Sequence, residues 1–300
     1  MKIDLHVHTT HSDGRESIDH VMHRAKDLGV DALALTDHDT TQGWAEASEL
    51  AVELGLGLIP GMELTTRANI PQPDGSILKF GVHMLNYLPD PQNSKLLQAL
   101  EGIHVGREER LREMSELISR HYEHSWDEVI AQIKPGATFG RPQIVDALVA
   151  RKYFETRDEG FEKLWGTLEG IYVPNRKVPD ALDAIRLIRE AGGVPVVAHP
   201  LSRSKYRKPG DPYPIENFRN MIEAGLGGIE VYHRENSEDD RLWLESVALK
   251  YDLIITGSSD YHGLTGKPNE LAENTTTPEM LARLVEQATG SRPINLPSLV

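Results

Sequence analysis

The chain has 300 residues, enough for one large α/β domain or two smaller ones, and a hydrophobic content of 39% supports a sizeable core. Its formal net charge is -14, from 46 acidic and 32 basic residues, which argues against duplex DNA as a partner because a polyanion would be repelled. Any phosphate-bearing substrate must therefore be met by local positive charge.

The absence of cysteine excludes disulfides, thiolate zinc sites and a cysteine nucleophile. Metals, if bound, are held by nitrogen and oxygen. The first residues lack the basic region and apolar run of a signal peptide, and no stretch approaches the roughly 18 apolar residues of a membrane span. We therefore expect a cytoplasmic protein with no membrane partner.

Short apolar, β-branched runs alternate with helix-length amphipathic segments along most of the chain. The predicted strands are Ile3–His8, Ala32–Thr36, Gly57–Leu64, Lys79–Tyr87, Val194–Ala198, Gly228–Tyr232 and Leu253–Gly257. The main predicted helices between them are Ser17–Leu28, Trp44–Leu54, Ala181–Ala191, Ile215–Ala224 and Asp239–Lys250. Alternation of this kind predicts an α/β fold with a parallel sheet or barrel.

The alternation breaks between about Asp90 and Lys177, where no strand is convincing. Helices are predicted there at Leu111–Ile118, Trp126–Ile133, Pro142–Ala150 and Gly160–Trp165. We interpret residues 91–177 as a helical insertion that covers the active site of a barrel domain formed by residues 1–90 and 178–300.

The first predicted strand carries two histidines on one face. Side chains alternate along a strand, so Asp4, His6 and His8 point to the side opposite the apolar residues. Two imidazoles at the C-terminal end of a strand offer a metal two nitrogen ligands, at the edge where parallel α/β folds keep their active sites. A half-exposed strand with polar residues outward is the alternative, which this motif alone does not exclude.

Similar residues lie at or near the C-terminal end of nearly every other predicted strand, and the fourth strand carries one as well. They are Asp13, His38, Glu63, His83, His199, Asp260 and His262. Six histidines and three carboxylates would thus converge on one rim, enough for two or three metals. Mixed imidazole and carboxylate ligation suits Zn²⁺, Mn²⁺ or Fe²⁺ better than Ca²⁺ or Mg²⁺ alone. Glu63 is the candidate carboxylate for bridging two ions.

These residues resemble the motifs of the PHP (polymerase and histidinol phosphatase) superfamily, in order along the whole chain. The matches are His6-x-His8 with Asp13, then Thr36-Asp37-His38, Ala198-His199-Pro200 and Asp260-x-His262. With Glu63 and His83 between them, all nine metal positions of a three-metal member are present. The resemblance implies a distorted (β/α)7 barrel and a centre of two or three divalent metals: Mn²⁺, Zn²⁺ or Fe²⁺, with Mg²⁺ also compatible.

The resemblance also implies a grouping of ligands. One metal would take His6, His8, Glu63 and Asp260, a second Glu63, His83 and His199, and a third Asp13, His38 and His262. The implied reaction is phosphoester hydrolysis by metal-activated water, with Glu63, Asp13 and His262 as candidate catalytic residues. Asp13 and His262 are also the candidates for trading protons with the leaving group, and the sequence does not separate ligand from general acid.

Within the superfamily, the chain is similar to the stand-alone TrpH/YciV-like branch, which carries the His-Ser-Asp-Gly loop seen at residues 11–14 and a helical insertion. That branch includes enzymes acting on nucleoside 3′,5′-bisphosphates and on short RNA from its 5′ end. The implied partner is a small phosphorylated nucleotide such as AMP or a 3′,5′-bisphosphate, with short single-stranded RNA as a second candidate.

An anionic substrate on an acidic protein calls for arginines aimed into the site. The candidates are Arg107, Arg141 and Arg203. Arg141 stands at a predicted helix start, where phosphate is favoured. For each arginine the alternative is an exposed salt bridge. A purine base would stack on an aromatic side chain of the insertion, for which the candidates are Tyr122, Trp126, Phe139 and Tyr172.

Two other functions stay open. Amidohydrolase-type enzymes acting on carbon substrates also gather His and Asp on strand ends, but this rim carries Glu63 where such enzymes place a carbamylated lysine. A catalytically silent metal-bound scaffold is the second alternative, although a structural zinc site closes with four ligands. Among the other histidines, His11 lies in the first metal loop and His233 ends the sixth strand, where it could reach the rim.

Overall fold

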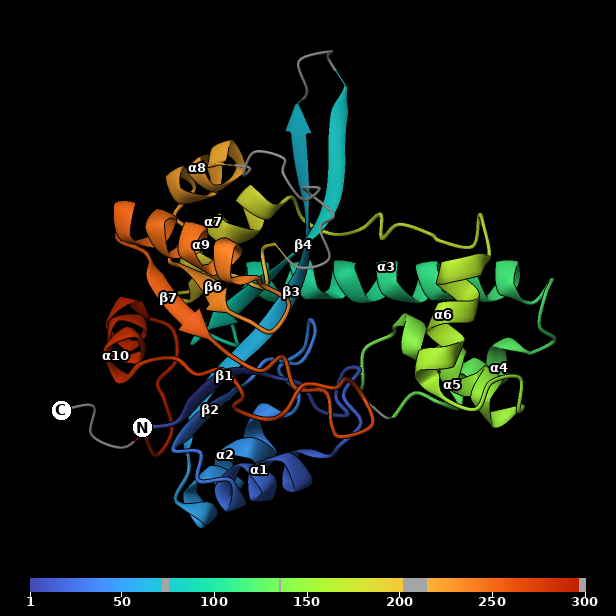
Figure 1. The fold of residues 1–300 in the computed structure, drawn as a ribbon, viewed down its shortest axis with the longest axis horizontal. Helices are drawn as coiled ribbons and strands as arrows, with labels where there is room; N and C mark the ends of the chain where they lie inside the picture. Colours follow the sequence, from blue (N-terminus) through green and yellow to red (C-terminus); the bar gives the residue numbers. More distant parts are fainter. Residues whose placement is uncertain (72–75, 135, 202–214, 297–300) are drawn as a thin grey trace.

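The computed structural model describes residues 1–71, 76–134, 136–201 and 215–296. Within these ranges seven strands form one sheet in sequence order (Figure 1). They are β1 (Ile3–Val7), β2 (Ala32–Leu35), β3 (Gly57–Pro71), β4 (Ile77–Tyr87), β5 (Val194–Val197), β6 (Gly228–Tyr232) and β7 (Ile254–Gly257). The sheet curls into a nearly closed barrel. The end of β1 meets the segment after β7, where the N–H of His8 donates to the carbonyl of Tyr261 at 2.8 Å.

Strand direction departs from the all-parallel expectation at β4. The pairs β1–β2, β2–β3, β5–β6 and β6–β7 are parallel, whereas β4 is antiparallel to both β3 and β5. Only residues 72–76 separate β3 from β4, and a parallel connection needs a dozen or more residues. Both strands are longer than predicted, and together they project from the barrel as a hairpin (Figure 1).

Helices cover the outside of the barrel. They are α1 (Ile18–Asp27), α2 (Trp44–Leu54), α7 (Ala181–Glu190), α8 (Ile215–Glu223), α9 (Glu238–Lys250) and α10 (Pro278–Gln287). Local signals explain their ends: Ser17 caps the first turn of α1, and Gly55 ends α2 with a φ of 62° that favours glycine. The α10 helix was not predicted, although Thr277 as N-cap and Pro278 in the first turn are the start signals of a helix.

A second lobe is built from α3 (Ser94–Ile118), α4 (Trp126–Ile130), α5 (Arg141–Ala150) and α6 (Arg157–Thr167). Figure 1 shows α3 running from the barrel into this lobe. The helix begins at Ser94, well before the predicted start at Leu111, because its first half packs Leu96 and Ile103 into the barrel core. Its second half places Leu111 in the separate core of the lobe. The α3 helix therefore joins the two cores.

No helix in the described part of the chain combines the length and the apolar character needed to cross a membrane.

Candidate active site

Two imidazoles from β1 form the first part of the site. His6 lies on β1, and His8 is the first residue after the strand. Because side chains alternate with a period of two, both imidazoles point to the same side. Both are buried, and their Nε2 atoms lie 3.0 Å apart. The Nδ1 of His6 lies 3.0 Å from Oε1 of Glu230 on β6. A carboxylate in this position orients the ring so that Nε2 faces the cluster.

Glu63 on β3 is buried, and its two carboxylate oxygens face different partners. Oε2 lies 3.3 Å from Nε2 of His6, 3.1 Å from Nε2 of His8 and 3.2 Å from Nδ1 of His38. Oε1 lies 2.7 Å from Nδ1 of His83 and 3.1 Å from Nε2 of His199. A carboxylate divided in this way is able to bridge two cations.

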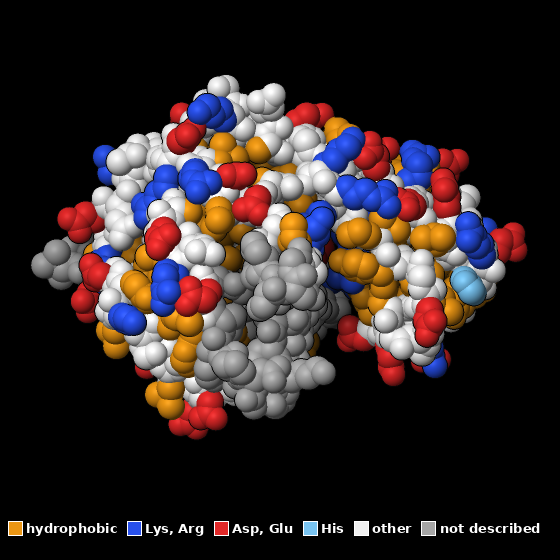
Figure 2. Space-filling view, turned by 90° about the horizontal axis from the view of Figure 1, so that it is seen from above, with side chains coloured by type: hydrophobic (Ala, Val, Ile, Leu, Met, Phe, Trp, Pro, Cys, Tyr) orange, Lys and Arg blue, Asp and Glu red, His pale blue; other side chains and the backbone are white. Residues whose placement is uncertain are grey.

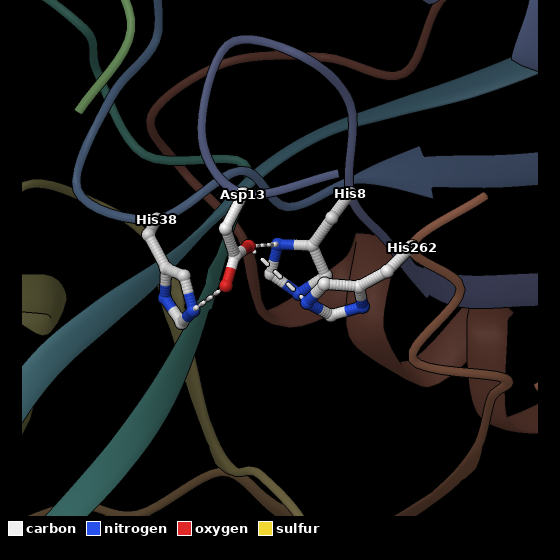
Figure 3. Close-up of side chains that lie close together, drawn as sticks. All are labelled: His8, Asp13, His38 and His262. Atoms are coloured by element: carbon white, nitrogen blue, oxygen red, sulfur yellow. Dashed lines mark ion pairs between the residues drawn. The ribbon is translucent and has the colours of Figure 1, made fainter. Parts of the chain in front are cut away.

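Asp13 lies in the loop after β1, with three histidines around its carboxylate (Figure 3). Oδ1 lies 3.2 Å from Nε2 of His262 and 3.7 Å from Nδ1 of His8, and Oδ2 lies 3.8 Å from Nε2 of His38. The loop is tight, because a Cβ at Gly14 would stand 2.7 Å from the backbone of His8. This turn brings the carboxylate back over the end of β1.

Asp260 follows β7 and also uses its two oxygens differently. Oδ1 lies 3.5 Å from Nε2 of His6 and 3.3 Å from Nε2 of His8. Oδ2 lies 2.6 Å from Nζ of Lys267 and 3.6 Å from Nε2 of His233. The histidine at the end of the sixth strand thus reaches the cluster. The sequence analysis missed Lys267, since it lies in a loop and no strand alternation predicts where its side chain points.

Further buried carboxylates hold the ligands in place, a role that the sequence did not predict for them. Glu230 accepts the backbone N–H of His199 at 2.6 Å and the hydroxyl of Ser258 at 2.8 Å, in addition to its contact with His6. Asp37 accepts the backbone N–H of Thr9 at 2.8 Å in the loop that leads to Asp13. A lone carboxylate in an apolar strand was the signal that could have identified Glu230.

The electrostatics of the cluster keep its carboxylates ionised. Burial alone would raise the pKa of Glu63, but the imidazoles of His83 and His38 outweigh burial and hold that pKa well below its ordinary value. Burial would likewise raise the pKa of Asp13, and His262 and His38 lower it further than burial raises it. Burial lowers the pKa of His38 to about 3, whereas for His6 and His8 the neighbouring carboxylates outweigh burial and raise the pKa, that of His8 to about 9. Metals bind ionised carboxylates and neutral imidazoles, so metal binding would release the protons that His6 and His8 hold without it.

The donor set fits divalent metals. Among the described residues, three groups have ligand atoms within 4.8 Å of one another: His8, Asp13, His38 and His262; His6, His8, Glu63 and Asp260; and His38, Glu63 and His83. Oδ1 of Asp13 and Nδ1 of His38 are buried without a hydrogen-bonding partner in the described chain, as expected for atoms that face a cation. The grouping differs from the implied one in three details: His8 joins the Asp13 group, His38 belongs to two groups, and His199 belongs to none.

The cluster lies on the wall of a cavity of about 920 Å³ that the barrel and the helical lobe share. In Figure 2 the surface is hollowed between the two, and Lys or Arg side chains are visible in the hollow. The cationic residues among the described lining are Arg67, Lys79, Arg107, Arg110, Arg141, Arg157 and Lys267. The local positive charge that an anionic substrate requires is therefore present despite the acidic net charge.

The three arginines predicted to bind substrate have different surroundings. Arg141 lines the cavity at the start of α5, with its guanidinium 5.3 Å from the ring centre of Trp165. Arg107 also lines the cavity, but it is buried and donates to Asp39, to Thr65 and to a backbone carbonyl. Arg203 lies outside the described residues.

Aromatic side chains of the lobe also face the cavity. Of the four candidates for base stacking, Tyr172 is among the described lining residues, whereas Tyr122, Trp126 and Phe139 pack against the core of the lobe. The cavity has two further aromatic side chains from α6, Phe161 and Trp165, which the sequence analysis did not single out.

Comparisons with known proteins agree on one family. The PHP domain model matches residues 4–191. The chain is 31% identical to a phosphoribosyl 1,2-cyclic phosphate 1,2-diphosphodiesterase from Eggerthella lenta, over 88% of this chain and 95% of the relative. It is 29% identical to a 3′,5′-nucleoside bisphosphate phosphatase from Chromobacterium violaceum, over 87% of each chain.

A solved structure has the same fold across nearly the whole chain. The crystal structure of a putative metal-dependent phosphoesterase from Bifidobacterium adolescentis superposes with a TM-score of 0.86 at 36% identity, covering 96% of both chains. The barrel, the predicted resemblance and the enzyme class are thereby confirmed. The chain belongs to the PHP domain family, and the protein is a metal-dependent phosphoesterase.

Proposed function

We propose that this protein hydrolyses phosphomonoesters of small nucleotides, with nucleoside 3′,5′-bisphosphates as its main substrates and the 5′ end of short RNA as a second one. The observation that carries the proposal is the shared cavity. It joins a metal-binding cluster on the barrel to arginines and aromatic rings on the helical lobe. We further propose that residues 91–177 form the insertion that closes over this cavity.

Two arginines of the lobe support binding of a phosphate group. Arg110 and Arg141 both line the cavity. Burial, and then repulsion by Arg141, lower the pKa of Arg110 to about 10. An anion between two neighbouring guanidinium groups would relieve this repulsion and accept charge-assisted hydrogen bonds. A substrate with two phosphates would place one at the metal cluster and the other at these arginines.

The aromatic wall supports a nucleobase. Phe161 and Trp165 line the cavity with ring centres 5.1 Å apart, and Tyr172 lines it with 60% of its surface exposed. Aromatic faces of this kind stack on bases.

The chemistry follows from the cluster. When bound, divalent metals supply positive charge to the phosphoryl group and activate water. We assign Mn²⁺, Zn²⁺ or Fe²⁺ to the nine predicted ligands, with Glu63 as the bridge. Asp13 Oδ1 lies 3.2 Å from Nε2 of His262, and whichever of the two does not hold a metal would be placed to give a proton to the leaving oxygen. Lys267 adds a positive charge on the cavity wall beside Asp260.

The test is phosphate release by Mn²⁺-loaded protein from a panel of substrates. The panel contains adenosine 3′,5′-bisphosphate, 5′-AMP, histidinol phosphate, a 5′-phosphorylated short RNA and phosphoribosyl 1,2-cyclic phosphate. We expect the highest kcat/KM for the bisphosphate, with shortening of the RNA as a weaker activity. Preference for the cyclic phosphate, which has no base for the aromatic wall, would reject the proposed substrate and leave the enzyme class intact.

A further inference from the structure

The loop that carries Asp13 is tied to the helical lobe by a largely buried arginine. Arg157, in the first turn of α6, donates from Nη1 to the backbone carbonyl of Asp13 at 3.1 Å. Its Nε donates to Oδ1 of Asp146 on α5 at 3.0 Å, and its Nη2 donates to Oδ2 of the same carboxylate. Asp146 also accepts from Arg15, at the other end of the Asp13 loop, at 2.9 Å. The side chain of Arg157 is 11% exposed.

A second buried arginine of the lobe holds the turn that carries His38. Arg107, on α3, donates from Nε to Oδ2 of Asp39 at 2.7 Å and from Nη2 to the hydroxyl of Thr65 at 2.7 Å. Asp39 follows His38 with a left-handed φ of 55°. The backbone carbonyl of Asp39 lies 2.7 Å from Nε2 of His104, which is also on α3. The lobe therefore contacts both chain segments whose side chains meet in Figure 3.

We propose that Arg157 and Arg107 are positioning residues, through which the helical lobe completes the metal group formed by His8, Asp13, His38 and His262. The ligands on β1 and β3 are held by the sheet itself. Asp13 and His38 instead lie on connections beyond the strand ends, where the arginines of the lobe add to the backbone contacts that the barrel makes. Each guanidinium donates to several acceptors at once and therefore cannot rotate. It holds the backbone next to Asp13 or His38 in one position.

The partners of the two side chains favour positioning over substrate binding. Three nitrogens of Arg157 already donate to Asp146 and to the Asp13 carbonyl. Arg107 donates to Asp39, Thr65 and the carbonyl of Phe139. Nη2 of Arg107 also lies 2.6 Å from Oδ2 of Asp39, so the two side chains form a close ion pair. The inference rests on the metal centre proposed above and not on the identity of the substrate.

The test measures Mn²⁺ binding to the full chain by titration calorimetry, with metal per chain counted by elemental analysis. In Arg157→Ala, Asp146 keeps Arg15 as a partner, so we expect a folded protein. One Mn²⁺ site should weaken by 10- to 100-fold while the others stay at wild-type affinity, the range typical of residues that orient metal ligands. Arg157→Lys should recover part of this loss, since an ammonium can still donate to one acceptor.

Arg151→Ala is the matched control, because Arg151 forms an exposed ion pair with Glu128 inside the same lobe. Its binding curve should equal that of the wild type. A wild-type Mn²⁺ binding curve for Arg157→Ala would overturn the inference. If KM rose while that curve stayed at wild type, Arg157 would be a substrate contact instead. Equal loss of all sites in both Arg157→Ala and Arg157→Lys, with collapse of Tm, would also overturn it.

The same measurement separates this inference from the proposed function. A wild-type protein that binds Mn²⁺ without releasing phosphate would remove the proposed substrate and still allow the positioning test. A wild-type protein that binds no divalent metal would remove both.

Discussion

At the scale of single residues, Glu63 has the most contacts with candidate ligands. One oxygen faces His6, His8 and His38, and the other faces His83 and His199. Replacing Glu63 by glutamine would leave one carbonyl oxygen and would place an amide NH₂ group against imidazole nitrogens. The two sides of the cluster would then lose their common ligand.

We therefore predict that Glu63→Gln lowers kcat/KM by about 100-fold or more. Metal charge contributes several kcal/mol to phosphoryl transfer, and about 1.4 kcal/mol corresponds to a factor of ten. The measurements are kcat/KM with excess Mn²⁺ and metal content per chain. Glu53→Gln, at an exposed position on α2, is the control and should leave both unchanged. Full activity and metal content in Glu63→Gln would contradict a bridging role.

At the scale of elements, α6 connects the lobe to the substrate space. Phe161 and Trp165 are four residues apart on this helix, so they share one face, and that face lines the cavity. The next turn of the helix toward its N-terminus carries Arg157, which contacts the metal loop. A single helix thus contributes both a base-stacking surface and a contact to the Asp13 loop.

The stacking role predicts a base-specific effect for Trp165→Ala. Stacking of a base on an aromatic side chain is worth about 1–3 kcal/mol, so KM for adenosine 3′,5′-bisphosphate should rise roughly tenfold or more. Hydrolysis of ribose 5-phosphate, which has no base, should change little. Tyr153→Ala, at an exposed aromatic residue of the same lobe outside the cavity lining, serves as the control. Equal losses on both substrates would argue against stacking.

At the scale of the whole molecule, a chain of net charge -14 concentrates carboxylates and cations in different places. Carboxylates gather at the strand ends, where a cation is needed to balance them. Arginines and lysines gather along the cavity that receives an anion. Loss of the metals would leave the buried carboxylates to be balanced by the imidazoles and by Lys267.

Metal binding should therefore stabilise the folded chain. A ligand at 100 times its Kd, bound only by the folded state, adds about 2.7 kcal/mol, which for a chain of this size corresponds to roughly 5 °C in Tm. We expect Mn²⁺ to raise Tm by this order and EDTA to reverse it, as followed by calorimetry. Ca²⁺, which prefers all-oxygen ligands, should do less. An unchanged Tm at saturating Mn²⁺ would speak against a metal centre in the folded protein.

The sequence by itself determined the seven strands and the candidate metal ligands that gather at one rim. These features are local: alternation with period two places His6 and His8 on one face, and residues that follow parallel strands share an edge. The family assignment followed from the same motifs and is confirmed by the comparisons. The ligand roles of the individual residues stay predictions.

Only the tertiary structure decided which side chains support that rim. Glu230 meets His6 across 224 positions of sequence, and Arg157 meets Asp13 across 144. The start of α3 and the position of Trp165 on the cavity likewise depend on packing between the barrel and the lobe. Local periodicity describes which face of an element is apolar. It carries no information on which distant element covers that face, because that depends on closure of the barrel and docking of the lobe.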